Sequence, residues 1–236
     1  MRISPNCVRE FVALKVDDHR LAEDLTHAGI AVEGINGSGA GTIFEMEITT
    51  NRVDAMNHYG VARECSAIYD FDLKPIAPKL PGTGQNESFP IEILEPALCA
   101  RYTAREIRGV RIEHSPRYIA ERLMIEDHHG ISNVADTTNY VLMEIGHPTH
   151  AFDFDLLEGG KIVVRRARQG EKLKTLDGVE RALHPDDLVI ADAVRPVALA
   201  GVMGGWDTMI TANTRNVLIE SAWFDPATVR RTARRP

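Results

Sequence analysis

The sequence has few cysteines, few aromatic residues and no excess of positive charge. Its three cysteines are widely separated, which fits reduced thiols and provides neither a disulfide framework nor the paired spacing of a zinc site. The 27 Lys and Arg residues are outnumbered by 34 Asp and Glu residues, so the net charge is −7. Dedicated nucleic-acid binders are usually basic, and any nucleic-acid contact here is therefore expected to be a local patch.

Long apolar runs are also absent. No stretch approaches the length of a membrane span, and the apolar h-region of a secretory signal peptide does not follow residues 1–5. We therefore expect a cytoplasmic protein with no membrane partner. The chain has 236 residues, 44% of them hydrophobic, which is enough for one large core or two small ones.

Residues 1–75 are expected to form a small α+β domain. Two short helices lead into a β-hairpin over 30–49, whose strands are joined by a glycine-rich loop at 37–41. Asp17 or Asp18 is expected to cap the second helix, and Asp54 the helix that follows the hairpin.

A stretch rich in proline and glycine, 76–89, is the expected linker to a second domain. Residues 90–225 are expected to form a larger, mixed α/β domain, and 226–236 to begin a further one. Ser115-Pro116 is expected to start a helix that runs to Gly130. The fold class predicted for the whole chain is α+β.

Two further elements of the second domain carry distinct signals. Asp177-Gly178 is a typical hairpin turn between two short strands. An apolar helix around 134–145 has polar residues at both ends, namely Thr138, Asn139 and His150. Polar side chains in such positions either satisfy backbone groups or line a pocket.

Several multi-residue blocks occur in a fixed order along the chain. They are Thr49 to Asp54, Asn133 to Tyr140, His147 to Asp153, Thr175 to Gly178, Ala198 to Gly205 and Leu218 to Pro226. Together these blocks closely resemble the N-terminal part of the β subunit of bacterial phenylalanyl-tRNA synthetase. Blocks at family spacing over nearly the whole chain are a more specific signal than any single short motif.

The resemblance implies a domain organisation. Residues 1–75 would be the B1-like domain, in which the loop 37–41 stands where the family usually carries an OB domain, and 90–225 would be the B3/B4 tRNA-editing domain. The family's aminoacylation site lies in the α subunit. We therefore expect no cofactor in this chain, with ATP and Mg²⁺ needed only by the full α/β synthetase, and no aminoacylation without the α subunit.

The resemblance also implies an activity, which is hydrolysis of mischarged Tyr-tRNA(Phe). A hydrophobic pocket shaped for phenylalanine rejects a ring with an added hydroxyl by only roughly 10²-fold, the scale known from other synthetases. A second site that requires the hydroxyl discriminates better, because phenylalanine would leave its buried polar group unpaired. The implied partners are the tRNA(Phe) acceptor end, tyrosine or a tyrosyl ester, and the α subunit.

Glu220 matches the family's reader of the tyrosine hydroxyl. It follows the apolar strand 217–219 and precedes apolar and aromatic residues, so its carboxyl group is expected to be desolvated. The alternative is a solvent-facing Glu on the polar side of a strand. We expect Glu220 and His150 to share one apolar hollow wide enough for a tyrosine ring.

The other expected site residues match the family in the same way. His150, Asn139 and Thr138 are expected near the ester that is hydrolysed, and Ala200, Gly201 and Gly204 on the binding surface. The alternatives are local hydrogen bonds at a turn and a helix start, and an ordinary glycine-rich turn. No Lys-Ser/Thr follows those glycines, which excludes a P-loop.

Two other functions are compatible with the sequence. The chain could be a β-like scaffold or binding module for tRNA, an aromatic amino acid or the α subunit, without turnover. A metal-dependent hydrolase is the third reading, but the histidine pairs at 128–129 and 147/150 lack the context of a zinc site. We therefore expect no metal ligands.

Overall fold

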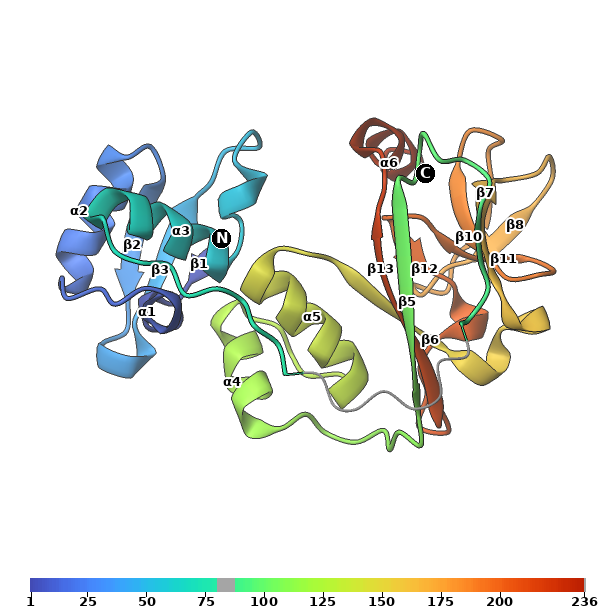
Figure 1. Ribbon diagram of the computed structural model, residues 1–236, viewed down its shortest axis with the longest axis horizontal. Coiled ribbons are helices and arrows are strands. Elements are labelled where there is room, and N and C mark those ends of the chain that lie inside the picture. The colour runs from blue at the N-terminus through green and yellow to red at the C-terminus, as the bar shows by residue number, and fades with distance from the viewer. Residues whose placement is uncertain (80–87, 236) are drawn as a thin grey trace. The chain divides into compact units, whose positions relative to one another are not determined.

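The computed structural model describes residues 1–79 and 88–235, and it divides into two compact units (Figure 1). The described part of the first unit is 1–79 with 114–147, and that of the second is 88–113 with 148–235. Both units combine helices with sheets, which confirms the predicted α+β class. The expected linker, 76–89, lies largely outside the described residues.

The first unit is built on a three-stranded antiparallel sheet of order β1-β3-β2. Its strands are β1 (Arg2–Ile3), β2 (Ala31–Asn36) and β3 (Ile43–Glu47), and its first helices are α1 (Pro5–Phe11), α2 (Asp18–His27) and α3 (His58–Tyr69). Apolar side chains of the helices pack with those of the sheet, including the fully buried Leu21, Leu25 and Phe44. The predicted hairpin is therefore confirmed as β2 and β3.

Helix caps in this unit agree with the sequence at one position and differ at another. Asp17 caps α2, since its side chain accepts a hydrogen bond from the Arg20 amide. The prediction that Asp54 caps the next helix is wrong: Asn57 caps α3 and accepts from the Gly60 amide at 2.7 Å. Asp54 lies in a preceding 3₁₀ turn, where it pairs with Arg52 and Arg63.

Helices α4 (Arg117–Ile125) and α5 (Asn133–Ile145) pack with the first unit. The predicted extension of α4 to Gly130 is wrong, because the backbone turns into the left-handed region at Asp127, where φ is 59°. Ser115 does not cap α4 either, and its hydroxyl instead donates to the Asp136 carboxylate of α5.

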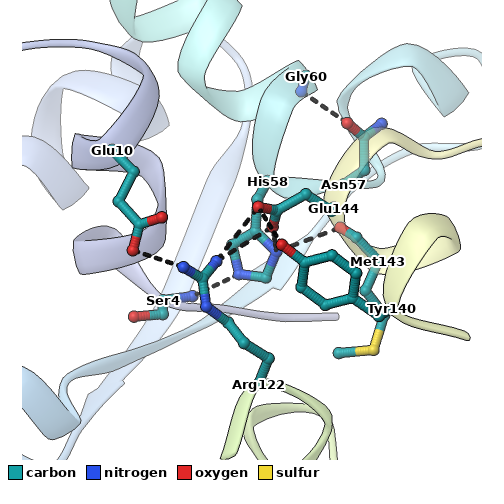
Figure 2. A network of polar contacts seen from close by, with 9 residues as sticks. All are labelled: Ser4, Glu10, Asn57, His58, Gly60, Arg122, Tyr140, Met143 and Glu144. Carbon is teal, nitrogen blue, oxygen red and sulfur yellow. Dashed lines mark hydrogen bonds and ion pairs between the residues drawn. The ribbon is translucent and has the colours of Figure 1, made fainter. Parts of the chain in front are cut away.

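A polar network anchors α5 within this unit (Figure 2). Arg122 lies between two carboxylates, Glu144 at 3.1 Å and Glu10 of α1. The buried His58 accepts from the Ser4 amide through Nε2 and contacts the Met143 carbonyl through Nδ1, both at 3.2 Å. Burial lowers the pKa of His58 to about 4, so the ring is neutral at pH 7.

These contacts divide the chain differently from the predicted boundaries, which put 90–225 in one domain. Met143 of α5 contacts His58 of α3, while Arg122 of α4 joins Glu144 of α5 to Glu10 of α1. The helix pair therefore packs with the N-terminal residues. The second unit is then formed by two chain segments, 88–113 and 148–235.

The second unit contains two principal sheets. A five-stranded sheet has the order β12-β11-β10-β7-β4, and a three-stranded sheet has the order β5-β13-β6. The strands of the first are β4 (Ile91–Ile93), β7 (Ile162–Arg166), β10 (Leu188–Ala191), β11 (Pro196–Leu199) and β12 (Met203–Gly204). Those of the second are β5 (Arg101–Arg108), β6 (Thr149–Asp153) and β13 (Asn216–Trp223).

The two sheets enclose one apolar core. Phe152 and Leu218 of the three-stranded sheet pack in the same cluster as Ile162, Ile190 and Val197 of the five-stranded sheet. Figure 1 shows β5 and β13 running side by side along the unit. Sheet-on-sheet packing of this kind buries the alternate side chains of each strand.

The remaining elements frame the second unit. The predicted hairpin at Asp177-Gly178 is confirmed: β8 (Lys172–Lys174) pairs with β9 (Glu180–Ala182), and Gly178 has φ of 81°. Helix α6 (Pro226–Ala233) follows β13, and the Asp225 side chain caps it by accepting a hydrogen bond from the Thr228 amide. Within the described ranges, no helix has the length and apolar character needed to cross a membrane.

Candidate functional site

The centre of the candidate site is a cross-strand pair. In the antiparallel ladder of β13 and β6, Glu220 lies directly opposite His150, and Leu218 lies opposite Phe152. Residues opposite one another share a face of the sheet, and so do residues two apart along a strand. Because Phe152 and Leu218 belong to the core between the sheets, Glu220 and His150 also face that layer.

Glu220 is buried and accepts a hydrogen bond from one hydroxyl. The residue is 5% exposed, and on its other side in the sheet it pairs with Ala104 of β5. The hydroxyl of Tyr102, two residues along β5, donates to Glu220 Oε2 at 3.3 Å. The expectation of a desolvated acid is therefore confirmed, and Tyr102 is a contact that the sequence did not reveal.

Burial raises the pKa of Glu220 to about 8, and the hydrogen bond from Tyr102 opposes this rise. At pH 7 most molecules therefore carry a neutral carboxylic acid at this position. A neutral carboxylic acid donates one hydrogen bond through its O–H and can still accept others. It can thus pair with a phenol hydroxyl in either direction.

His150 presents an unused nitrogen to the same layer. The residue is partly exposed, but its Nε2 is buried and has no hydrogen-bond partner among the described residues. Burial lowers the pKa of the imidazole to about 4, and the ring edge packs against Phe152. A buried polar nitrogen without a partner is costly, and such a group often marks a place where a ligand or water binds.

Gly204 of β12 gives the imidazole its space. A Cβ atom at this position would lie 2.3 Å from His150 Cε1 and 2.6 Å from Nε2, with Leu176 Cδ1 at 3.1 Å. No side chain fits there, so only glycine allows the ring to lie against the β12 backbone. The structure therefore brings together three of the expected residues, Glu220, His150 and Gly204.

Ala200 and Gly201 have different neighbours. Ala200 is buried in the core between the sheets, and Gly201 is in the left-handed region with φ of 68°. A Cβ on Gly201 would meet Val229 of α6 and Phe224. Gly201 thus lies beneath the C-terminal helix, and a binding role for either residue stays a prediction.

Thr138 and Asn139 belong to the first unit. Both lie on α5, and the Thr138 hydroxyl donates to the Ala135 carbonyl at 2.7 Å. This is the local helix hydrogen bond that was the alternative to a pocket role. A role for these two residues near an ester also stays a prediction.

Two hollows of the structure lie away from these residues. One hollow of about 490 Å³ lies between α2 and β2, and one of about 140 Å³ lies beside α6. None of the predicted site residues lines either of them. Since Glu220 is nearly sealed, a ligand ring can reach it only after a covering side chain moves. In the described part of the chain, no three His, Cys, Asp or Glu side chains gather as metal ligands would.

A profile of the B3/4 domain family matches residues 98–236, which is more than half of the chain. The chain belongs to the B3/4 domain family. This confirms the predicted family resemblance. The matched segment contains α4, α5 and every strand of the two sheets except β4, so the B3/4 match includes the two helices assigned to the first unit.

Related proteins point in the same direction. The phenylalanine–tRNA ligase beta subunit of Anaeromyxobacter dehalogenans is 51% identical over 195 residues, covering 82% of this chain and 24% of that protein. The beta subunit of Moorella thermoacetica is 51% identical over 200 residues, covering 82% of this chain and 24% of that protein. That of Protochlamydia amoebophila is 40% identical over 232 residues, covering 97% of this chain and 29% of that protein. This chain thus spans about a quarter of the length of these relatives.

One solved structure also overlaps the chain. An N-terminal fragment of the phenylalanyl-tRNA synthetase beta subunit from Pyrococcus horikoshii covers 97% of this chain and 69% of its own, with 15% identity and a TM-score of 0.48. That likeness is too low to support an argument about the fold. The B3/4 assignment depends on the family profile.

Proposed function

We propose that this chain is the proofreading part of a phenylalanine–tRNA ligase β subunit and hydrolyses mischarged Tyr-tRNA(Phe). The family match and the names of the relatives support the β-subunit assignment. The observation that carries the proofreading role is the Glu220–His150 pair, in which a buried acid and a neutral imidazole face one apolar layer.

The acid supplies the specificity in this proposal. A tyrosyl ring that reaches Glu220 exchanges a hydrogen bond with the carboxyl group through its hydroxyl. A phenylalanyl ring has no hydroxyl, so the carboxyl group loses this hydrogen bond. Leaving a buried polar group unpaired costs about 1–3 kcal/mol, which corresponds to roughly five- to 150-fold in rate.

The imidazole positions water in this proposal. A ring whose pKa is about 4 is a weak base at neutral pH. His150 Nε2 therefore orients a water molecule but contributes little as a general base. The substrate's own ribose hydroxyl assists the attack on the ester carbonyl, and Thr138 and Asn139 are assigned near the ester on family resemblance alone. Exchanging His150 for alanine should therefore weaken hydrolysis without abolishing it.

The partners follow from the same proposal. The tRNA(Phe) acceptor end delivers the tyrosyl ester, and the synthetase α subunit performs aminoacylation in the complete enzyme. Because the chain spans about a quarter of its relatives, tRNA capture by the rest of the β subunit is expected to strengthen binding.

The test is deacylation of Tyr-tRNA(Phe) and Phe-tRNA(Phe) by the purified chain, against the rate without protein. Faster loss of tyrosine than of phenylalanine is the expected result. Saturable binding of the charged tRNA without turnover would favour the binding-module alternative. Equal acceleration of both esters would mean that the chain does not proofread.

A further inference from the structure

A short antiparallel ladder connects the turn after β8 to the residues after β12. Thr175 forms a bridge with Gly205, and the Leu176 amide donates to the Gly204 carbonyl at 3.0 Å. One step further along, Lys174 Nζ lies 4.5 Å from the centre of the Trp206 ring. Gly204 ends β12 and Trp206 begins the 3₁₀ turn that follows, so the two residues lie two positions apart, beside Leu176 and Lys174 respectively.

This part of the surface is exposed at Lys174 and Leu176, and it meets the His150 imidazole at Gly204. Lys174 and Leu176 are exposed, whereas Thr175 between them is buried, as alternation along a strand requires. Trp206 is 38% exposed. At Gly204 the place of a side chain is occupied by the imidazole of His150, whose buried Nε2 has no partner among the described residues.

The polar and aromatic groups therefore follow one another in a fixed order, from the buried Glu220 through His150 to the exposed Trp206. Glu220 and His150 are direct cross-strand neighbours, with Cβ atoms about 5 Å apart. Two residues of extended chain then span about 7 Å, from Gly204 to Trp206. A tyrosyl ester of adenosine has the same order of groups: a phenol, an ester on a ribose, and a base.

We propose that Trp206 and Lys174 form the subsite for the 3′-terminal adenosine of the mischarged tRNA. The adenine ring stacks on the Trp206 indole, and the Lys174 ammonium moves from the indole to the neighbouring phosphate. This subsite rests on the proposed proofreading function, since every aminoacyl-tRNA carries its amino acid on a terminal adenosine.

The local chemistry suits a single-stranded RNA end. An exposed aromatic ring beside a cation is the usual combination for binding such an end, because the ring stacks with a base and the cation meets the backbone. Asp207, the adjacent acid, is paired with Arg195 at 2.7 Å, so its charge is compensated near the phosphate. The competing explanation is that the Lys174–Trp206 contact only stabilises the hairpin.

Fluorescence separates the two explanations, because the chain has two tryptophans, Trp206 and Trp223. Trp223 is also exposed, at 48%, and provides a matched control. In a Trp223→Phe variant, an RNA microhelix ending in CCA should quench the remaining Trp206 saturably. The same microhelix without its terminal A should quench less. In a Trp206→Phe variant, neither RNA should quench Trp223.

Kinetics provides the second readout. Trp206→Ala should raise the KM for Tyr-tRNA(Phe) about tenfold or more, Trp206→Phe should restore most of that loss, and Trp223→Ala should keep the wild-type KM. If the wild-type chain deacylates but Trp206→Ala keeps its KM, the subsite is wrong while the proposed function stands. If the wild-type chain does not deacylate, the proposed function fails, and the quenching experiment still decides whether Trp206 binds the RNA end.

Discussion

Glu220 and His150 face each other across the ladder of β13 and β6, with the acid raised to a pKa of about 8 and the imidazole lowered to about 4. The two groups are therefore both uncharged at pH 7. Burial is the main cause in each case, and it acts in opposite directions because it disfavours the charged form of each group.

The protonation of Glu220 should be visible in the stability of the chain. The pKa of Glu220 is raised in the folded state. Its contribution to the free energy of unfolding is therefore fully present below the unfolded pKa of about 4.5, and it is lost as the pH rises through 8. Between pH 6 and pH 8.5 the free energy of unfolding of the wild type should fall by roughly 2 kcal/mol more than that of Glu220→Gln. Urea unfolding at both pH values measures the difference, and parallel pH dependence in the two proteins would contradict it.

Removal of the Tyr102 hydroxyl should raise the pKa of Glu220 further. Tyr102 donates to Glu220 Oε2 and so favours the ionised form. In Tyr102→Phe the Glu220 carboxyl should titrate at a higher pH than in the wild type, and stability at pH 6 should fall by about 1 kcal/mol. The ¹³C chemical shift of the Glu220 carboxyl as a function of pH is the measurement. A midpoint that stays in place or falls would show that the hydroxyl does not act on this acid.

A methyl group at position 204 should displace the imidazole. Because the new Cβ would lie 2.3 Å from His150 Cε1, Gly204→Ala must move His150, and deacylation of Tyr-tRNA(Phe) should fall at least tenfold. Gly41→Ala is the matched control, since a Cβ there meets no atom within 4 Å and its φ is not positive. Wild-type deacylation rates in Gly204→Ala would show that the position of the ring does not matter.

Arg122 should be essential for the packing of α5 in the first unit. Its guanidinium lies between Glu144 and Glu10, and Arg122→Met leaves the buried Glu144 without its cation. Breaking a buried pair in this way typically costs about 3–5 kcal/mol, and partial exposure of Arg122 argues for the lower end. Replacing both partners, as Arg122→Met with Glu144→Leu, should recover part of that loss in urea unfolding. A double variant no more stable than the single one would count against the pairing.

The sequence predicted the individual elements better than their assembly. The apolar residues on both sides of Glu220 correctly indicated a buried acid, and Asp177-Gly178 correctly indicated a hairpin. Local chemistry decides such features, because turns and caps depend on neighbouring residues. Even so, Asn57 and not Asp54 caps α3, because Asp54 lies in a 3₁₀ turn and the helix begins only at His58.

Long-range pairing could not be predicted from pattern. Nothing in the strand around Glu220 indicates that His150 is its cross-strand neighbour or that Tyr102 donates to it. The register of distant strands follows from the whole sheet. For the same reason the apolar pattern of α5 indicated a buried face but not its partners. Those partners are His58 of α3 and, through Arg122, Glu10 of α1.

The account depends most on Glu220 as the group that distinguishes a tyrosyl from a phenylalanyl ring. The decisive measurement is the ratio of deacylation rates for Tyr-tRNA(Phe) and Phe-tRNA(Phe), in the wild type and in Glu220→Ala, with folding checked by thermal unfolding. The account predicts a wild-type ratio well above one, and it predicts that this ratio falls roughly five- to 150-fold in the variant. A folded Glu220→Ala protein that keeps the wild-type ratio would contradict it.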